Sequence, residues 1–173
     1  LYNTVDSIVV GNFLGSEALA AVGSSSSLIG LLISFSMGAA AGAGVIVSQF
    51  IGAQNEKGVH ESVHTALAIA LILGVVLTVL GVTLSPQILR WMGTPDEVRP
   101  QSVIYLRLYF AGLLFSVLYN MASGILNAVG NSKRSLLYLA IASFTNIVLD
   151  LLFIPVLKMG IAGAAIATDI SQV

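Results

Sequence analysis

Two polar side chains, Asn146 and Asp150, stand in a largely apolar segment that runs from Leu136 to Val156. They lie four residues apart, so on a helix they share one face. A carboxylate inside an apolar segment of this length costs about 2.5–3.5 kcal/mol on membrane-insertion scales and needs a partner, a water-filled cavity or a bound cation. This acid is therefore a functional-site hypothesis, and Asn146 adds a second oxygen ligand. The alternative is an aspartate that only hydrogen-bonds a neighbouring helix.

The composition defines the class of protein in which this segment lies. Hydrophobic residues make up 57% of the chain and charged residues only 9%, whereas an ordinary soluble domain has about 25% charged residues. Long continuous apolar runs predict an all-α, polytopic transmembrane helical bundle in a lipid bilayer, not a β-barrel. The chain has no cysteine, which excludes disulfides and thiolate metal sites. A net charge of −1 without a basic patch argues against nucleic acid as a partner.

Polar turns divide the apolar sequence into five to six helices. We expect them at about residues 1–11, 19–51, 60–89, 95–128, 134–156 and 161–173. Both ends lie in apolar sequence, and we expect a fragment in which the first and last helices are incomplete. Thr94, Pro95 and Glu97 predict the start of the fourth helix, with Thr94 as N-cap and Glu97 closing a capping box. Gly38 and Gly42 predict that the second helix packs closely against a neighbour, and a hinge is the alternative.

Three further polar features have a structural and a functional interpretation. His60 and His64 have a spacing that can bind a metal, but no other strong ligand is near in the sequence. We interpret them as polar residues at the membrane–water interface. Arg107, in the fourth helix, is expected to extend its charge toward the interface or to pair locally. Asn120 lies deeper in that helix and is a candidate to face a cavity.

A second acid, Asp6, lies about as deep as Asp150. The first helix ends near Gly11 and the fifth near Val156, and both run in the same direction. Thr168 lies two turns into the sixth helix, which begins on that side. Four oxygen-bearing side chains could therefore converge, and their carboxylate, amide and hydroxyl groups suit a hard cation such as Na⁺ or a proton carried by the acids. They are Asp6, Asn146, Asp150 and Thr168.

Several short motifs, taken in order along the chain, resemble the multidrug and toxic compound extrusion (MATE) family. The resemblance covers essentially all 173 residues and depends on the order and spacing of the set. The motifs are Leu1-Tyr-Asn-Thr-Val-Asp-Ser-Ile-Val-Val-Gly11, Gly15, Leu19-Ala-Ala-Val-Gly23, Gln49-Phe-Ile-Gly-Ala53, Met92-Gly-Thr-Pro95, Gly130-Asn-Ser-Lys133 and Asn146-Ile-Val-Leu-Asp150.

The resemblance implies twelve helices in two six-helix bundles around a central cavity, with this chain as most of the first bundle and the C-terminal bundle absent. It also implies a cation site at Asp6, Asn146, Asp150 and Thr168. Tyr2, Asn3 and Asn120 are candidates to line the cavity, whereas Asp169 is left out because it points about 100° away from Thr168. The amino terminus and the loops at 52–58 and 130–134 would face the cytoplasm.

The function that the resemblance implies is transport, not enzymatic catalysis. We expect a multi-pass protein of the plasma (inner) membrane, an antiporter that exports amphipathic or cationic organic compounds. Its energy would come from Na⁺ or H⁺ influx, without any other cofactor. A related lipid-linked oligosaccharide flippase is the alternative, but it should carry several basic cavity residues, and only Arg107 qualifies. An intramembrane aspartyl protease needs Tyr-Asp and Gly-x-Gly-Asp contexts, which Asp6 and Asp150 lack. A purely structural subunit would not need these acids together with Asn146.

Overall fold

The chain forms a bundle of helices, and a computed structural model describes the backbone of residues 2–172 and the side chains of residues 7–172. This part of the chain contains no strand, which confirms the predicted all-α class. The elements in order are α1 Tyr2–Leu14, α2 Ser16–Gly52, α3 Glu56–Trp91, α4 Arg99–Ala128, α5 Ser132–Leu151, the π-helical turn η1 Leu152–Val156, and α6 Ile161–Ser171.

Four of these segments are long and apolar enough to cross a membrane. They are α2, α3, α4 and the α5–η1 segment, with lengths of 37, 36, 30 and 25 residues. A span needs only about 20 residues. The shorter α6 is also apolar. The chain is therefore an integral, multi-pass membrane protein, as its composition predicted.

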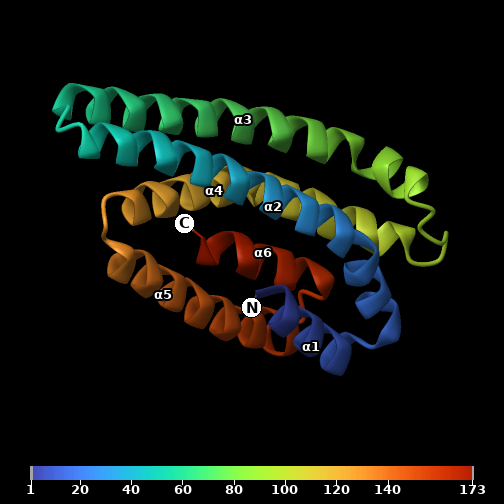
Figure 1. Ribbon diagram of the computed structural model, residues 1–173. Coiled ribbons are helices and arrows are strands. Elements are labelled where there is room, and N and C mark those ends of the chain that lie inside the picture. The colour runs from blue at the N-terminus through green and yellow to red at the C-terminus, as the bar shows by residue number, and fades with distance from the viewer. Residues whose placement is uncertain (1, 173) are drawn as a thin grey trace.

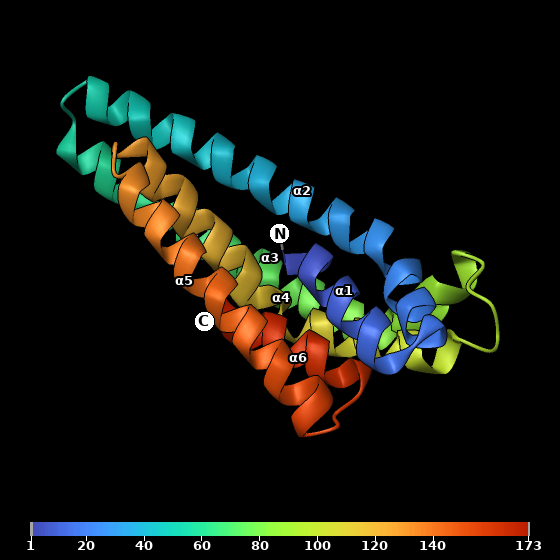
Figure 2. The same cartoon turned by 90° about the horizontal axis from the view of Figure 1, so that it is seen from below.

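The helix α4 lies at the centre of the bundle. The helices α2 and α3 form a long antiparallel hairpin against it, and α6 lies between α4 and α5 (Figure 1). The view from below shows α1 between α2 and α6 (Figure 2), and α1 also contacts α5 and η1. Large buried side chains of α4 fill the middle of the bundle, namely Tyr105, Leu106, Tyr109, Phe110 and Leu113.

Glycines allow α4 to approach α2 closely, but they are not the pair that the sequence predicted. A Cβ placed on Gly124 would lie 2.7 Å from the Ala40 carbonyl oxygen, and one on Gly44 would lie 3.2 Å from the Gly124 carbonyl oxygen. Around Gly38 and Gly42, by contrast, the space within 4 Å of such a Cβ is open. The predicted close packing at these two glycines is therefore wrong for the described bundle. Gly44 lies about 200° around the helix from Gly42, since each residue turns it by about 100°.

The start of α4 also differs from the prediction. Its N-cap is Val98, so the capping box expected at Thr94 does not form. Pro100 stands in the first turn instead, where a missing N–H costs nothing. Residues ahead of the helix form a separate turn. The Arg99 guanidinium donates to the Thr94 carbonyl over 2.8 Å and pairs with Asp96.

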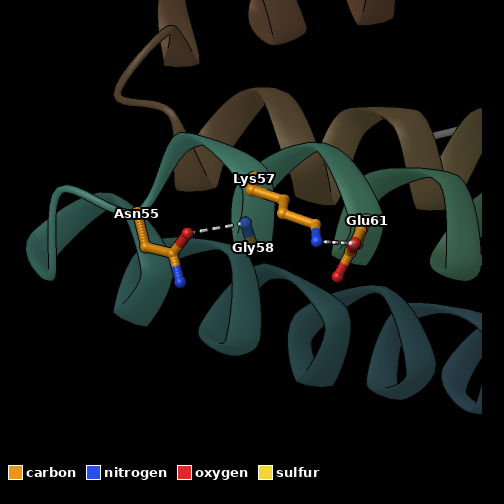
Figure 3. Close-up of polar contacts among 4 residues, drawn as sticks. All are labelled: Asn55, Lys57, Gly58 and Glu61. Atoms are coloured by element: carbon orange, nitrogen blue, oxygen red, sulfur yellow. Dashed lines mark hydrogen bonds and ion pairs between the residues drawn. The ribbon is translucent and has the colours of Figure 1, made fainter.

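The helix α3 begins at Glu56, about four residues earlier than expected. Asn55 is its N-cap, and the side-chain oxygen of Asn55 accepts a hydrogen bond of 2.9 Å from the Gly58 N–H (Figure 3). Lys57 and Glu61 form an exposed ion pair of 3.7 Å on the first turns. The polar stretch that suggested a longer loop is therefore the capped first turn of the helix.

Candidate functional site

One narrow stripe of α5 faces the protein. Its members lie one helical turn apart and are buried, while the rest of the surface of α5 is mostly exposed and apolar. Asn146 and Asp150 are both 0% exposed. Ala142, one turn before them, is small and also buried, which lets neighbouring helices come near. The spacing i, i+4, i+8 gives one face of a helix, so the two polar groups that the sequence singled out point away from lipid.

The structure brings Thr168 of α6 to this stripe. Thr168 is 3% exposed, and its hydroxyl donates to the Ala164 carbonyl over 3.1 Å. The same hydroxyl oxygen accepts a hydrogen bond from Asn146 Nδ2 over 3.4 Å. Asn146 and Thr168, 22 residues apart in the chain, thus meet as the sequence suggested. Their role in cation binding stays a prediction.

A π-helical turn follows Asp150 directly and shapes the packing of α6. In this turn the Leu157 N–H donates to the Leu152 carbonyl over 2.9 Å, five residues back. Pro155 lies in the turn and has no N–H for an α-helical bond. Gly163 of α6 packs against the turn, since a Cβ at Gly163 would lie 3.0 Å from the Phe153 Cβ. The sequence predicts an ordinary helix over residues 134–156, although Pro155 is a signal of the change.

The first helix carries three predicted site residues, Tyr2, Asn3 and Asp6, and their side chains lie outside the described residues. The backbone of α1 is described, and α1 packs against α5, η1 and α6. The helix that carries Asp6 therefore contacts both helices that carry the other predicted ligands, Asn146, Asp150 and Thr168.

A cavity lies beside the stripe, between α2, α4, α5 and α6, and none of the described residues that line it is charged. Its volume is about 540 Å³, within the usual range of about 300–1,000 Å³ for small-molecule sites. Asn120 lines this cavity, and its side chain donates to the Ser116 carbonyl over 2.8 Å; its place in a transport cavity stays a prediction. Thr168 also lines it. The other polar lining residues are Tyr109, Ser116, Tyr119, Ser123, Asn127, Ser135 and Gln172.

Two charged residues of the bundle lie apart from this lining. The carboxyl of Asp169, which the sequence analysis left out of the site, lies directly against Gly112 of α4. A side chain at residue 112 would occupy the same space, so Gly112 is the signal that sequence reasoning missed. Arg107 is exposed on α4 and is absent from the cavity lining.

Long apolar helices, a cavity between them and a buried acid and amide beside it define the class of this chain, a multi-pass helical membrane protein. The MatE family matches residues 1–152, and the chain belongs to this family. It is 37% identical over 171 residues to "Probable multidrug resistance protein YpnP" of Bacillus subtilis, and 38% identical over 177 residues to "Probable multidrug resistance protein YoeA" of the same organism.

The matches cover almost all of this chain but a smaller part of each relative. They include 99% and 98% of this chain and 38% and 37% of those two proteins. The structure described as "Crystal structure of MATE in the bent conformation" superposes with a TM-score of 0.95 at 35% identity, over 99% of this chain and 38% of that one. The chain thus spans somewhat over a third of the length of these relatives.

Proposed function

We propose that this chain is the first bundle of a secondary active antiporter, one that exports amphipathic or cationic organic compounds in exchange for Na⁺ or H⁺. One observation carries the proposal: Thr168 lines the cavity and also accepts the hydrogen bond from buried Asn146. A single side chain therefore touches both the space for a substrate and the stripe for a coupling ion. The two relatives named for multidrug resistance support the same direction of transport.

The buried polar stripe would work through its charge. A Na⁺ ion would take oxygen ligands from Asp6, Asn146, Asp150 and Thr168, whereas a proton would neutralise one of the carboxylates. Either event removes a charge that is costly to bury in a membrane. The occupied and empty forms then favour different packings of α1, α5 and α6. The ion shifts the equilibrium only as far as its affinity differs between these packings.

The flippase alternative is less well supported by the cavity. Such a protein would be expected to hold the anionic linkage of its substrate with several basic groups. Among the residues that the structure describes, neither lysine nor arginine lines the cavity, and Arg107 lies on the exposed side of α4. Amide and hydroxyl groups suit the polar parts of an organic compound better than a diphosphate.

Transport in proteoliposomes tests the proposal directly. Proteoliposomes that contain the complete transporter would be loaded with a fluorescent organic cation. Efflux of the cation would be followed under an imposed Na⁺ gradient and then under a pH gradient. We expect one gradient to drive efflux, and Asp150→Asn and Asp6→Asn to abolish it. Asp96→Asn, in the exposed turn before α4, is the matched control. Normal gradient-driven efflux by both variants would overturn the proposed ion site.

A further inference from the structure

Two histidines form a stacked pair on the first turns of α3. The ring centroids of His60 and His64 lie 4.1 Å apart, with 31° between the ring planes. The Nδ1 atom of His64 lies 2.8 Å from the His60 carbonyl oxygen. A carbonyl oxygen can only accept, so Nδ1 of His64 must carry the hydrogen and donate it. In the neutral ring the free lone pair is then on Nε2.

This hydrogen bond gives His64 the arrangement of a metal ligand. Histidines that bind metals almost always donate their other ring N–H to a carboxylate, a backbone carbonyl or water, which fixes the tautomer and the ring orientation. Two histidines at i and i+4 on a helix supply two such ligands on one face. We propose that His60 and His64 form a two-histidine site for a divalent first-row transition-metal ion such as Zn²⁺, with water completing its coordination.

The backbone beneath the pair is held in place before any ion binds. The Asn55 cap fixes the first turn through the Gly58 N–H. Gly58 is itself buried against the ring of Phe50 from α2, so a Cβ there would meet that ring. Both histidines line an open cavity of about 940 Å³ between the end of α2 and the start of α3. The ring nitrogens are therefore reachable from solvent while their helix is anchored.

The side chains around the pair determine what kind of site it is. Glu61 is engaged by Lys57 over 3.7 Å, as Figure 3 shows. Glu56 lies one turn before His60 and lines the same cavity. No three histidine, cysteine, aspartate or glutamate side chains come together as a metal site among the residues that the structure describes. The site therefore has two nitrogen ligands and binds more weakly than a closed structural site.

The chemistry of this pair separates it from the buried stripe of α5. Imidazole nitrogen favours transition metals, whereas carboxylate and carbonyl oxygens favour hard cations. Residues 60–64 also have the H-E-x-x-H pattern of zinc proteases, in which the glutamate acts as general base. Here Glu61 faces Lys57 in an exposed ion pair and the histidines are open to solvent, so the pair is expected to bind a metal ion without hydrolysing a substrate. The pair lies near the α2–α3 turn, at the other end of the bundle from the end of α5 (Figure 1).

Metal titration of the complete, tag-free transporter in detergent tests the site. Equilibrium dialysis with Zn²⁺ would compare wild type with His60→Gln and His64→Gln. We expect each variant to lose this site or weaken it about 10-fold or more, since even the loss of a group that hydrogen-bonds a metal ligand costs about 10–100-fold in metal affinity. Glu61→Gln is the matched control and should keep the affinity. Unchanged Zn²⁺ affinity and stoichiometry in both histidine variants would overturn the proposal.

A second measurement uses only the wild-type protein. Diethyl pyrocarbonate modifies accessible histidines, and mass spectrometry of the peptide that contains residues 60–64 reports the rate for each ring. Saturating Zn²⁺ should slow modification of His60 and His64 together, several-fold or more. Equal rates with and without Zn²⁺ would contradict the site. Mg²⁺ is the control ion, because it prefers oxygen ligands and should protect neither ring.

Discussion

Two regions of the bundle place polar side chains one helical turn apart, but the side chains are buried in one region and exposed in the other. In α5, Asn146 and Asp150 are fully buried, and Thr168 of another helix reaches Asn146. At the start of α3, His60 and His64 are exposed and contact each other. The same spacing thus makes an internal oxygen site in one case and an open nitrogen site in the other. Spacing selects a face of a helix, and the neighbouring helices decide what that face does.

The largest expected difference between the two regions is in transport. Asp150→Asn keeps the size of the side chain but removes the charge that an ion or proton would neutralise, so we expect coupled efflux to fall about 100-fold or more. His60→Gln should leave efflux within about twofold, since surface substitutions usually have small effects. Initial rates in proteoliposomes at equal protein density measure both. Equal losses in the two variants would remove the functional distinction between the regions.

Substitutions at two glycines, Gly124 and Gly58, compare how tightly the helices pack inside the bundle and near the histidine pair. Gly124→Ala places a methyl carbon 2.7 Å from the Ala40 carbonyl oxygen, and this backbone atom cannot shift without moving its helix. We expect a loss of about 1–3 kcal/mol, as is typical of overpacking. The atoms nearest to a Cβ at residue 58 all belong to the ring of Phe50, a side chain that can move to another χ1 rotamer, and Gly58→Ala gains up to about 1 kcal/mol of helix propensity. Thermal unfolding in detergent should therefore show a larger loss for Gly124→Ala.

The hydroxyl of Thr168 tests whether the stripe and the cavity act together. Thr168→Val keeps the shape but removes the oxygen that accepts from Asn146. A buried donor left without its acceptor costs about 1–3 kcal/mol, and about 1.4 kcal/mol corresponds to a tenfold change in an equilibrium constant. We expect the concentration of coupling ion at half-maximal efflux to rise about tenfold. Thr168→Ser is the control that keeps the hydroxyl, and equal behaviour of the two variants would argue against a role for it.

The sequence predicted the buried stripe well because its signals are local and strong. An acid and an amide four residues apart in an apolar segment define a helix face without knowledge of the fold. The bundle class followed from composition alone. The contact between Asn146 and Thr168 depended on helix direction, which the order of the segments supplied. What the stripe binds is set by its partners in space, and the sequence leaves Na⁺ and H⁺ as alternatives.

Other features depended on competition between neighbouring signals, and there the sequence misled. Thr94 and Pro95 make a good helix start in isolation, yet the chain turns first and α4 begins beside Pro100. Gly38 and Gly42 have a spacing that suits close packing, but the contact surface of α2 passes through Gly44. In both places more than one residue could start the helix or make the close contact. Only the positions of the neighbouring helices decide which residue does so.

The smallest expected effect concerns the helix start beneath the histidine pair. Asn55→Ala removes the cap on Gly58, and loss of such a cap costs about 0.5–2 kcal/mol. We expect faster hydrogen exchange of amides in the first turn of α3, a weaker Zn²⁺ affinity and unchanged exchange in α5. Asn55→Asp keeps an acceptor and should restore both properties. Since α5 packs against α1, α4 and α6 and has no comparable contact with α3, faster exchange there would mean that the two regions are coupled.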